Sequence, residues 1–555
     1  MIKKYVADFE TQVGVPTFVW CFGITQLYKK DSFVYGSSIE EFIDHISKLG
    51  RSDIYFHNLK FDGKFIVDYL LKNNWTIVED KPCTPKTFSL LVDEVGSWYS
   101  ISLYFKDNVN IYDSLKKIPL SVEKMAIAYN LPIKKGSIDY FKDRTNHIIT
   151  NEEIDYVKND VEIVKYVLEH HFNEGLKKIT ASSDALFDFK EIISEKNFKK
   201  YFPILSPEID NLIRDGYNGG WTHKKKGVYK VGKGVVIDVN SMYPSIMYNY
   251  LLPTGYPMII QGKPDKEDFE NYCYFYEVKL SCTLKKNHLP TIYDKKVGSY
   301  RSCNYLEECI NLTRVFTQYD LKLILKHYNI ISIEYIKTLI FKGEKGLFTP
   351  YIDKWYTMKN EANKQGNKPL KSICKLMLNS LYGKFGQSPN NNNRTAVLEN
   401  NLVKYPVVKH EDRETIYIPV ACFITAIGRF IIISSAQLNY KHFCYSDTDS
   451  IHLNCDKEQI KLSSLLQLDP EKLGYFDLES QFKQATYLRN KTYALKLIDD
   501  SVKICAAGLK EESRAKLKFE DFDFGLVVQG GASKSKTVEG GVIIYENSFQ
   551  ITKNV

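Results

Sequence analysis

The sequence predicts a mixed α/β protein of several domains. The chain has 555 residues, and since a typical domain holds about 150 residues, roughly three to five domains are expected. Over residues 1–172, short apolar segments alternate with helical patterns, which is typical of an α/β domain. A polar helical stretch follows, and the glycine-rich turn DGYNGGW (215–221) then indicates a hinge, so the main domain boundary is expected near residues 180 to 220.

The composition narrows the class of protein and its environment. With 44% hydrophobic and 26% charged residues the chain is globular, and its net charge of +8 permits nucleic acid as a partner without requiring it. Eleven cysteines without a CxxC pair argue against a disulfide framework and a structural zinc site, which fits the cytoplasm. Two acids in the first ten residues exclude a secretory signal, and Pro419 interrupts the longest uncharged run (415–428), so no membrane segment is predicted.

The N-terminal domain is expected to contain three apolar strands, KKYVADF (3–9), SDIYFHN (52–58) and NVNIYDS (108–114). It should end in a helix over 151–172, because apolar residues recur there at helical spacing and Asn151 with the two following Glu residues makes a good helix start. The apolar positions of this helix are Ile154, Val157, Val161, Val164 and Leu168.

Acidic residues in this domain form a pattern that favours metal binding. Asp8 and Glu10 share one face of the first strand, and Asp62 lies in HNLKFDGKF (57–65). Tyr156 and Asp160 are one turn apart on one face of the predicted helix. Each pair alone is weak evidence, but four carboxylates and a tyrosine together can bind two metal ions and orient a water against a phosphodiester. Nuclease chemistry is therefore the hypothesis for this domain.

The second part of the chain begins with a β-rich segment that contains VVIDVNSMYPSIM (235–247), followed by a long mixed region (252–346). A helix is predicted over residues 367–386, with Pro369 at its first helical position. A polar insert begins with QSPNNNNR (387–394), which is typical of a loop tip. An apolar strand then leads into CYSDTDSIHL (444–453), and the chain ends in a short β-rich tail.

Two aspartates, Asp447 and Asp449, interrupt an apolar and aromatic run. In a strand they would share a face, and two carboxylates about 4 Å apart repel by about 4 kcal/mol at an effective dielectric of about 20. If no other acidic strand lay nearby, protonation of one aspartate or a turn in which the aspartates face water would be a sufficient explanation. Asp238, at the end of a second apolar strand, favours instead an oxygen-rich site for two Mg²⁺ ions that could serve in-line phosphoryl transfer.

The predicted helix over 367–386 has one polar face. The residues on this face fall within about 80° of one another at 100° per residue, and they are Lys371, Lys375, Asn379 and Tyr382. Leu376, Met377 and Leu381 lie on the other side, as a core face. Such a stripe can be a solvated surface, but next to an acidic site its cations and ring suit a triphosphate and a stacked base.

These motifs together resemble the family B DNA polymerases. In chain order, DVNSMYP (238–244), KLMLNSLYG (375–383), YSDTDS (445–450) and KTY (491–493) resemble the polymerase motifs of that family. DFE (8–10), HNLKFD (57–62) and YVKND (156–160) are similar to the three motifs of its proofreading exonuclease, and YNGG (217–220) to the linker that coordinates the two activities. The resemblance implies an RNase H-like 3′–5′ exonuclease domain followed by a right-hand polymerase with palm, fingers and thumb.

The closest similarity is to the protein-primed polymerases of small phages and linear replicons. Its basis is the short chain, the segment 252–346 and the second insert at 387–417, and DSLKK (113–117), TAIGR (425–429) and GYFDLES (474–480) also resemble DNA-contact signatures of this subfamily. The resemblance implies strand displacement, dNTPs and primed DNA as substrates, and a terminal protein as primer. It also implies a monomer that forms a heterodimer with terminal protein at initiation, in the cytoplasm of a bacterial host.

The resemblance also implies domain limits. These are an exonuclease at 1–180, a first palm segment at 181–251, insertion subdomain 1 at 252–346, fingers at 347–386, insertion subdomain 2 at 387–417, a second palm segment at 418–511 and a thumb at 512–555. Subdomain 1 should contact the terminal protein and DNA, and subdomain 2 should support processivity and strand displacement.

Carried over to this chain, the polymerase motifs assign catalytic metal ligation to Asp238 and Asp449, with the Val239 carbonyl, and a supporting role to Asp447. Tyr243 would lie under the sugar and exclude a 2′-hydroxyl. The remaining nucleotide-binding residues would be Lys359, Lys371, Lys375, Asn379 and Tyr382; NKQG (363–366) resembles an insertion that puts Lys359 in question. The residues expected to contact DNA or the primer are Tyr217, Gly219, Gly220, Ser241, Thr425, Arg429, Lys491 and Tyr493.

In the exonuclease, the resemblance assigns metal binding to Asp8, Glu10, Asp62 and Asp160, water orientation to Tyr156, and a catalytic role to Lys135. Ser137 stands where the subfamily has Asp, and Asp139 is a candidate substitute. The residues expected to grip the frayed 3′ strand are Thr11, His57, Asn58, Phe61, Phe65, Ser114 and Leu115. Two Mg²⁺ ions are expected at each site, with Mn²⁺ as an alternative.

Two other functions are compatible with the sequence. One is a family B polymerase that uses only ordinary nucleic-acid primers. The other is a DNA-binding relative without turnover, against which the intact Asp238, Asp449, Lys375 and Tyr382 argue.

Overall fold

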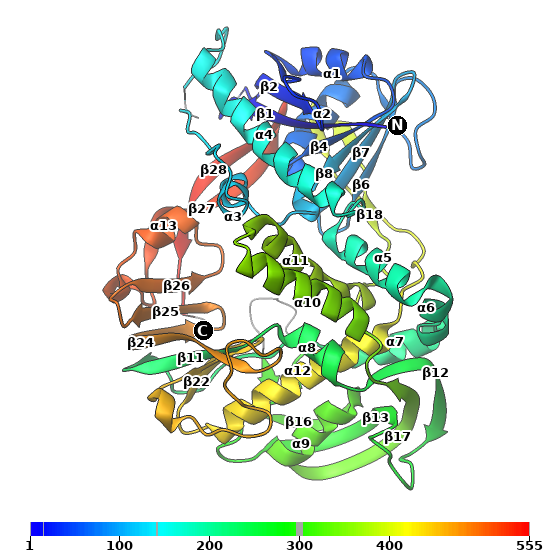
Figure 1. The fold of residues 1–555 in the computed structure, drawn as a ribbon, viewed down its shortest axis with the longest axis vertical. Helices are drawn as coiled ribbons and strands as arrows, with labels where there is room; N and C mark the ends of the chain where they lie inside the picture. Colours follow the sequence, from blue (N-terminus) through cyan, green and yellow to red (C-terminus); the bar gives the residue numbers. More distant parts are fainter. Residues whose placement is uncertain (1, 15, 140–141, 296–303, 554–555) are drawn as a thin grey trace.

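The structure is a computed structural model that describes residues 2–14, 16–139, 142–295 and 304–553. Within these ranges the chain builds two sheets of eight strands, one of four and four two-stranded pairs. Figure 1 shows the N-terminal sheet at one end of the long axis and the other large sheets toward the opposite end. Helices α10 (Thr349–Lys364) and α11 (Lys368–Phe385) lie between them.

The N-terminal sheet has the order β3-β2-β1-β4-β8-β7-β6-β5, and β1, β4 and β8 run parallel at its centre. The strands are β1 (Lys3–Thr11), β2 (Val19–Gln26), β3 (Val34–Gly36), β4 (Ser52–Phe56), β5 (Thr76–Ile77), β6 (Thr87–Val92), β7 (Trp98–Tyr104) and β8 (Asn108–Asp113). The helices of this domain are α1 (Ile39–Ser47), α2 (Leu59–Lys72), α3 (Val122–Ala128) and α4 (Asn151–Asn173). The predicted helix start is confirmed, since Thr150 and Glu153 form a reciprocal capping box at α4.

Helices α5 (Ala181–Ile193), α6 (Glu195–Tyr201) and α7 (Pro207–Asp215) lead to the second large sheet. This sheet has the order β26-β25-β24-β11-β23-β22-β9, with β10 paired to β24. Its strands are β9 (Thr222–Lys224), β10 (Lys230–Val231), β11 (Gly234–Val239), β22 (Phe443–Asp447), β23 (Ser450–Leu453), β24 (Phe476–Arg489), β25 (Thr492–Leu497) and β26 (Val502–Ala506). Helices α8 (Met242–Asn249) and α12 (Ile418–Leu438) contact each other, and α12 contacts β22 and β23.

The prediction of an apolar strand before CYSDTDSIHL is wrong, because this segment forms helix α12. The helix is buried on nearly every side, so its sequence lacks the helical period that distinguishes a half-exposed helix from a buried strand. Pro419 lies in its first turn, where the missing N–H is tolerated. Among the described residues this is the one helix long and apolar enough to cross a membrane, but 89% of that span is buried inside the protein, as in a core helix.

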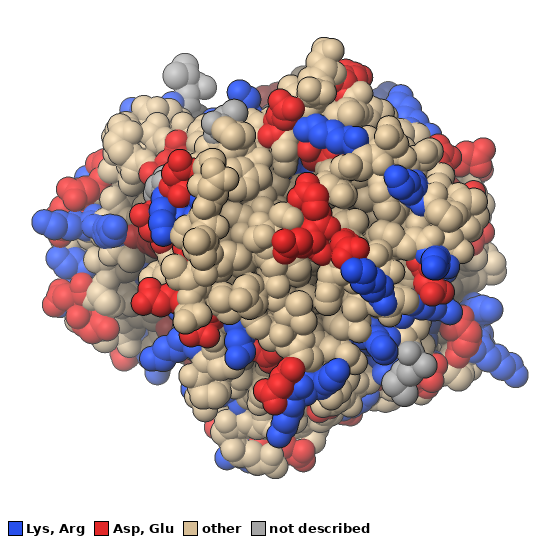
Figure 2. Space-filling view, turned by 90° about the horizontal axis from the view of Figure 1, so that it is seen from above, with Lys and Arg blue, Asp and Glu red and all other residues tan. Residues whose placement is uncertain are grey.

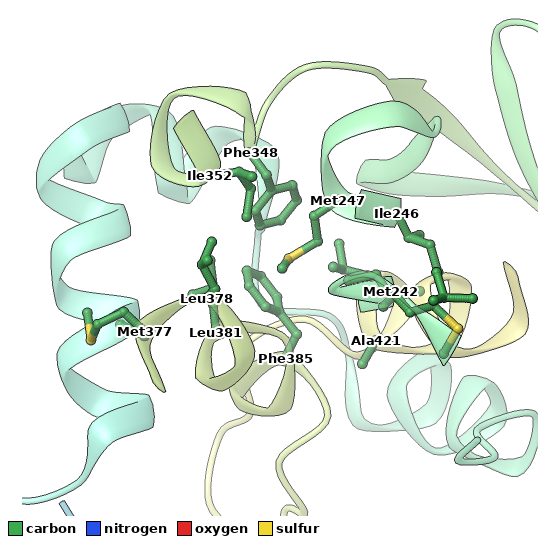
Figure 3. Packing of buried hydrophobic residues seen from close by; sticks show 14 of the residues in the cluster. Met242, Ile246, Met247, Phe348, Ile352, Met377, Leu378, Leu381, Phe385 and Ala421 are labelled. Atoms are coloured by element: carbon green, nitrogen blue, oxygen red, sulfur yellow. The ribbon is translucent and has the colours of Figure 1, made fainter. Parts of the chain in front are cut away.

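Helices α10 and α11 are anchored to the second sheet by an apolar cluster. In Figure 3, Met247 of α8, Phe348 at the start of α10 and Phe385 of α11 converge. The buried side of α11 consists of Ile373, Cys374, Met377, Leu378, Leu381 and Phe385, and Leu376 is only half-buried. Asn367 caps α11, so Pro369 is its second residue and not the first as predicted.

The mixed region after α8 forms a four-stranded sheet with the order β12-β17-β13-β16. Its strands are β12 (Leu252–Gln261), β13 (Tyr272–Leu284), β16 (Glu308–Thr317) and β17 (Tyr328–Glu344), and α9 (Gln318–His327) packs against it. The short strands β14 (Ile292–Tyr293) and β15 (Tyr305–Leu306) pair separately.

The C-terminal tail forms α13 (Glu511–Ala515) and a long hairpin of β27 (Val527–Val538) and β28 (Gly541–Gln550). The hairpin tip reaches the N-terminal domain, where the Gly540 N–H donates to Asp68 Oδ1 at 3.3 Å. Gly541 lies so close to Phe65 of α2 that an added Cβ would come within 2.4 Å of the ring.

The polar insert forms two small hairpins, and its strands are β18 (Asn393–Arg394), β19 (Val397–Glu399), β20 (Leu402–Lys404) and β21 (Val407–Val408). Strands β19 and β20 contact α2, and β20 also contacts β27. Ala396 and Val403 are buried in the core of the N-terminal domain, and the rings of Trp98 and Tyr405 are 5.4 Å apart. The insert and the C-terminal hairpin therefore meet on the same helix.

The surface carries both signs of charge. On the face shown in Figure 2, Lys and Arg side chains are interspersed with Asp and Glu side chains, and a group of acidic residues lies near the middle. This mixture agrees with a net charge of only +8.

Candidate active sites

Asp447 and Asp449 lie in a tight hairpin and do not share a strand face as predicted. Asp447 ends β22 and pairs with Ser450 of β23, so Thr448 and Asp449 form a two-residue loop. Thr448 has a φ of 63°, which reverses the chain and lets the two carboxylates take different directions. The loop is fixed from behind, because the Thr448 N–H donates to Trp221 O at 2.9 Å.

The two aspartates have different partners. Asp447 Oδ1 accepts from Lys491 Nζ at 2.9 Å and from Thr222 Oγ1 at 3.0 Å, so its charge is balanced inside the protein. Asp449 lies beside Asp238, and the Val239 N–H donates to Asp449 O at 3.0 Å. The two aspartates therefore differ in the structure. The charge of Asp447 is neutralised by Lys491, whereas Asp449 lies next to the carboxyl of Asp238.

Burial and neighbouring carboxylates raise the pKa of both carboxyls in this second pair. The pKa of Asp238 is raised to about 8, first by burial and then by Asp449 and Glu479. The pKa of Asp449 is raised to about 6, mainly by burial, with Asp447 and Glu479 contributing. Glu479 is itself paired with Lys503 at 2.7 Å. Two half-buried carboxylates with raised pKa values are the electrostatic setting in which a bound cation is most favourable.

Burial first and then Asp449 raise the pKa of Tyr382, so the polar face of α11 adjoins this carboxyl pair at Tyr382. Lys375 and Asn379 are exposed, and Lys371 Nζ donates to Asn363 Oδ1 at 2.6 Å. The pKa of Lys359 in α10 is lowered by burial first and then by Lys375 and Lys371, so three ammonium groups are neighbours here. Such a cluster of like charges favours an anion of high charge between the cations.

Two tyrosine rings pack against each other at an interplanar angle of 43° near Asp449. Tyr243 is the second residue of α8 and Tyr382 lies on α11, and their ring centroids are 4.3 Å apart. Ser241 is the N-cap of α8 and has a φ of 50°. The chain therefore turns shortly after β11, so that Asp238 and Tyr243 lie on either side of this turn.

The YNGG loop packs against the turn of the β22–β23 hairpin that carries Asp447 and Asp449, the catalytic hairpin. A Cβ at Gly220 would lie 2.7 Å from Thr448 Cγ2, so only glycine fits there. Tyr217 extends toward the end of α11, where its hydroxyl would lie 2.5 Å from a Cβ at Gly386. The loop thus connects α11 with the turn that carries Asp449.

Arg429 and Thr425, for which DNA contact was predicted, are buried in α12, with exposed fractions of 4% and 2%. The Arg429 guanidinium forms a bidentate pair with Asp320, the closer contact being 2.8 Å, and it donates to the carbonyls of Asn218 and Gly219. Thr425 Oγ1 donates to Ala421 O. In this structure, therefore, both side chains bond within the protein, and Arg429 holds the YNGG loop.

Lys491 and Tyr493 lie on the β24–β25 hairpin. Lys491 has a φ of 56°, and its N–H donates to Tyr445 OH at 3.0 Å while its ammonium pairs with Asp447. Tyr493 packs with Tyr445, ring centroids 5.1 Å apart. Both residues are therefore coupled to β22, next to the catalytic hairpin.

A second acidic group lies in the N-terminal domain. Asp8 and Glu10 come from β1, Asp62 from the first turn of α2 and Asp160 from α4. The pKa of Asp8 is raised to about 7 by burial and by Asp160, and burial with neighbouring carboxyls raises the pKa of Glu10 and Asp62 well above normal. Lys135 Nζ lies 3.2 Å from Asp160 Oδ2, and Tyr156 is buried one turn before Asp160. The structure thus brings together all residues predicted for this site.

The residues expected to hold a single strand lie around this group. His57 bonds Ser114 Oγ at 3.0 Å and the Leu120 carbonyl at 2.7 Å, and the Asn58 N–H donates to Asp113 Oδ1. Thr11 ends β1, Leu115 is half-buried, and Phe61 packs against Phe65 with ring centroids 5.5 Å apart. Phe65 is only 1% exposed under the C-terminal hairpin, so in this structure it is not accessible to a strand.

The donor sets of both sites suit hard divalent cations. Asp62 Oδ1 and Asp160 Oδ1 are buried without a hydrogen-bond partner, as expected of oxygens that bind a cation. The polymerase site offers Asp238, Asp449 and a backbone carbonyl, and Mg²⁺ commonly takes only one or two carboxylates and completes its shell from phosphates and water. Among the described residues, no group of three or more His, Cys, Asp or Glu side chains is arranged so that it could hold a metal ion.

Several residues of these sites were not found from the sequence. Thr222 lies on β9 two residues after the YNGG motif, Lys503 lies on β26 outside every motif, and Glu479 lies within GYFDLES, where only a DNA contact was expected. Arg144 follows the Lys135 motif and is 4% exposed. An isolated arginine in an otherwise exposed, polar segment gives little sequence signal, because burial depends on contacts with distant residues.

Known proteins resemble this chain over its whole length. The family of type B DNA polymerases, organellar and viral, matches residues 43–153 and 137–464 of the chain. The DNA polymerase of Bacillus phage Nf is 38% identical over 99% of both chains, and that of Bacillus phage phi29 is 36% identical over 99% of both. The solved structure of phi29 DNA polymerase complexed with primer-template DNA and incoming nucleotide substrates matches with a TM-score of 0.91, 35% identity and complete coverage of both chains.

A polymerase joined to a proofreading nuclease is therefore the class that the fold and the comparisons define. The chain belongs to the type B DNA polymerases of organellar and viral origin. It is a DNA-directed DNA polymerase with 3′–5′ exonuclease activity, and its mixed α/β multidomain fold confirms the predicted fold class. Dependence on divalent metal ions is a property of this family.

Proposed function

We propose that the chain replicates the DNA of a small phage or linear replicon from a terminal protein primer, with strand displacement and proofreading. The single observation that supports the polymerase site is the pairing of Asp238 with Asp449 next to Tyr382 of α11, the helix that also carries Lys371 and Lys375. The phage relatives, with coverage of 99% of both chains, support a replicative role inside a host cell.

For synthesis, Asp238, Asp449 and the Val239 carbonyl would hold Mg²⁺, or Mn²⁺ in its place. Two such ions, when bound, acidify the primer 3′-hydroxyl and neutralise the leaving pyrophosphate. Lys359, Lys371 and Lys375, with Asn379, would bind the triphosphate as a group of cations and donors. Tyr382 would pack on the new base pair, and the Tyr243 ring would occupy the space of a 2′-hydroxyl and so select dNTPs.

The primer end would be held by residues next to the catalytic hairpin. Lys491 reaches from the β24–β25 turn to Asp447 and would fix the primer terminus, with Tyr493 behind it. Ser241, Tyr217, Gly219 and Gly220 would contact the template side. We assign Arg429 and Thr425 an indirect role, because both are buried and Arg429 holds the YNGG loop.

For proofreading, Asp8, Glu10, Asp62 and Asp160 would hold two Mg²⁺ ions and Tyr156 would orient the attacking water, with Lys135 supplying positive charge at Asp160. The backbone carbonyl of Asp139 accepts a hydrogen bond from Arg144 Nη2, and Ser137 cannot supply a carboxylate. The frayed strand would lie along Thr11, His57, Asn58, Phe61, Ser114 and Leu115, and Phe65 would join them once uncovered.

We propose the following domain limits. The exonuclease would occupy 1–180, the palm 181–251 and 418–511, the fingers 347–386 and the thumb 512–555. Insertion subdomain 1 (252–346) would contain the sheet from Leu252 to Glu344, and subdomain 2 (387–417) the hairpins from Asn393 to Val408.

DNA and dNTPs are the proposed substrates, because the solved phi29 polymerase structures contain primer-template DNA and incoming nucleotides. Terminal protein is the proposed priming partner, as a heterodimer with an otherwise monomeric enzyme in the host cytoplasm. To test priming, the enzyme is incubated with terminal proteins of related phages, dATP and labelled nucleotide. A covalent protein–dAMP product supports the proposal, whereas extension of ordinary primers without any such product favours the nucleic-acid-primed alternative.

Extension of a primed single-stranded circle without helicase or clamp tests the remaining functions. Products many times the circle length support intrinsic processivity and strand displacement. Products that stop at one circle length contradict strand displacement, and absence of extension contradicts the polymerase site. The Asp449→Ala variant should bind primer-template but not extend it, which excludes contaminating polymerase.

A further inference from the structure

Arg144 joins three parts of the nuclease site that come from different segments of the chain. It is 4% exposed, and its guanidinium lies 4.6 Å from the centre of the Trp20 ring. Its Nη1 donates to Lys142 O at 2.9 Å and its Nη2 to Asp139 O at 3.0 Å. The same Nη2 lies 3.1 Å from Glu153 Oε1.

Two of these contacts, with Glu153 and Asp139, lead to residues of the proposed nuclease site. Glu153 belongs to the capping box of α4, the helix that carries Tyr156 and Asp160 one and two turns later. Asp139 is the far end of the segment that begins with Lys135, whose ammonium lies 3.2 Å from Asp160. The backbone N–H of Arg144 donates to Gln12 Oε1 at 2.9 Å. Gln12 directly follows β1, the strand that carries Glu10.

The segment that Arg144 holds also packs against the tyrosine. A Cβ at Gly136 would lie 3.0 Å from Tyr156 Cδ2, so the backbone next to Lys135 rests on the ring that would orient water. A shift of this backbone would move both the Lys135 ammonium and the Tyr156 ring relative to the carboxylates.

We propose that Arg144 is a positioning residue for 3′–5′ degradation. Its guanidinium fixes the Lys135–Asp139 segment relative to the start of α4, and its backbone N–H fixes the same region relative to Gln12, which follows β1. Its planar guanidinium donates in several fixed directions at once, and a lysine ammonium cannot reproduce that geometry. Arg144 does not touch the substrate in this role. This inference rests on the proposed nuclease site.

The test measures degradation of a single-stranded oligonucleotide by Arg144→Ala, Arg144→Lys and native enzyme. Because a displacement of about 1 Å in a catalytic group can cost on the order of 100-fold in rate, kcat should fall by at least about 10-fold in Arg144→Ala, with KM changed by less than about 3-fold. Primer extension by the same preparations should be unchanged. Methylguanidine should restore part of the degradation rate to Arg144→Ala, because it can occupy the vacated site.

Matched variants separate the possible results. Arg51 is an exposed arginine of the same domain, so Arg51→Ala should degrade DNA like the native enzyme. If Arg144→Ala does not yield folded protein, Glu153→Gln, which keeps the cap length but removes the charge facing Arg144, should show the same loss of kcat. Native kcat in folded Arg144→Ala, or in Glu153→Gln, would overturn the inference, as would an equal loss of primer extension.

Asp8→Ala distinguishes this inference from the proposed site itself. If Asp8→Ala still degrades DNA, the nuclease site is wrongly assigned. If Asp8→Ala is inactive while Arg144→Ala keeps native kcat and KM, the site is supported and only the positioning role fails.

Discussion

At the scale of single residues, neighbours decide which carboxylate does the chemistry. The sequence makes Asp447 and Asp449 look equivalent, and spacing alone placed them on one strand face. Asp447 is contacted by Thr222 of β9 and by Lys491 of the β24–β25 turn. No local sequence pattern reveals these contacts or the hairpin that separates the two aspartates. The acidic residue types could be predicted from the sequence, whereas their partners could not.

Substitution of the two aspartates should give unequal losses of primer extension. Asp449→Asn should lower kcat by about 1,000-fold or more, the order of loss on removing a group aimed at developing charge. Asp447→Asn should cost about 10- to 100-fold, as for residues that orient a site without binding the reacting atoms. Single-nucleotide addition under single-turnover conditions measures both rates. Equal losses would show that the Lys491 pair does not distinguish the two carboxylates.

At the scale of elements, half-exposed segments followed their sequence patterns and fully buried ones did not. Helix α4 and the polar face of α11 were predicted because one side of each meets water. Helix α12 was predicted as a strand because burial on all sides removes the periodic signal. The C-terminal hairpin was predicted only as a β-rich tail, since its docking on α2 depends on Gly541, which meets the distant Phe65.

Gly541→Ala should weaken the docking of the β27–β28 tip on α2. The new methyl group would lie 2.4 Å from the Phe65 ring, and the φ of 148° at this position is also unfavourable for alanine. Product length per binding event on a primed circle should fall several-fold while single-nucleotide addition stays native. Gly525→Ala is the control, because its φ of 89° is also strained but no atom lies within 4 Å. Equal effects of the two variants would attribute the loss to backbone strain.

The Lys117–Asp184 ion pair connects the end of β8 to α5. Both side chains are 2% exposed, and Lys117 Nζ also donates to Lys178 O at 2.9 Å. Lys117→Met should lower the free energy of unfolding by about 3–5 kcal/mol, because it leaves a buried carboxylate unpaired. Lys117→Met with Asp184→Leu should recover most of this loss. The stability of the variants is compared by their calorimetric transition temperatures. If Lys117→Met alone is as stable as the native protein, the prediction is wrong.

At the scale of the whole molecule, the order of domains could be predicted from motifs, but the contacts between them could not. Ala396 and Val403 belong to an insert that looked like a polar loop, yet they are buried against the N-terminal domain with exposed fractions of 1% and 3%. Such contacts depend on how distant surfaces fit, and a run of asparagines contains no information about its docking partner.

Replacing residues 395–406 with Gly-Gly should shorten products without slowing chemistry. Arg394 and Val407 are paired across the β18–β21 hairpin, so a two-residue turn can close it. The change removes the contacts of β19 and β20 with α2 and β27. Displacement synthesis on a primed circle should stop early, whereas extension over a short gap should stay native. Full-length displacement products would show that this hairpin is not needed.

The contacts among α2, β20 and the β27–β28 tip join the nuclease domain to the insert and to the C-terminal hairpin, and we expect these parts to form a closed circuit around bound DNA. A duplex threaded through such a circuit can leave by sliding off an end, but a covalently closed template has no end. To leave a circular template, the polymerase must then open one of these protein contacts. The time that the polymerase stays bound should therefore be longer on a circular template than on a linear one. Cutting away residues 1–180 to obtain a polymerase that does not degrade DNA would open this circuit, whereas Asp8→Ala would leave it intact.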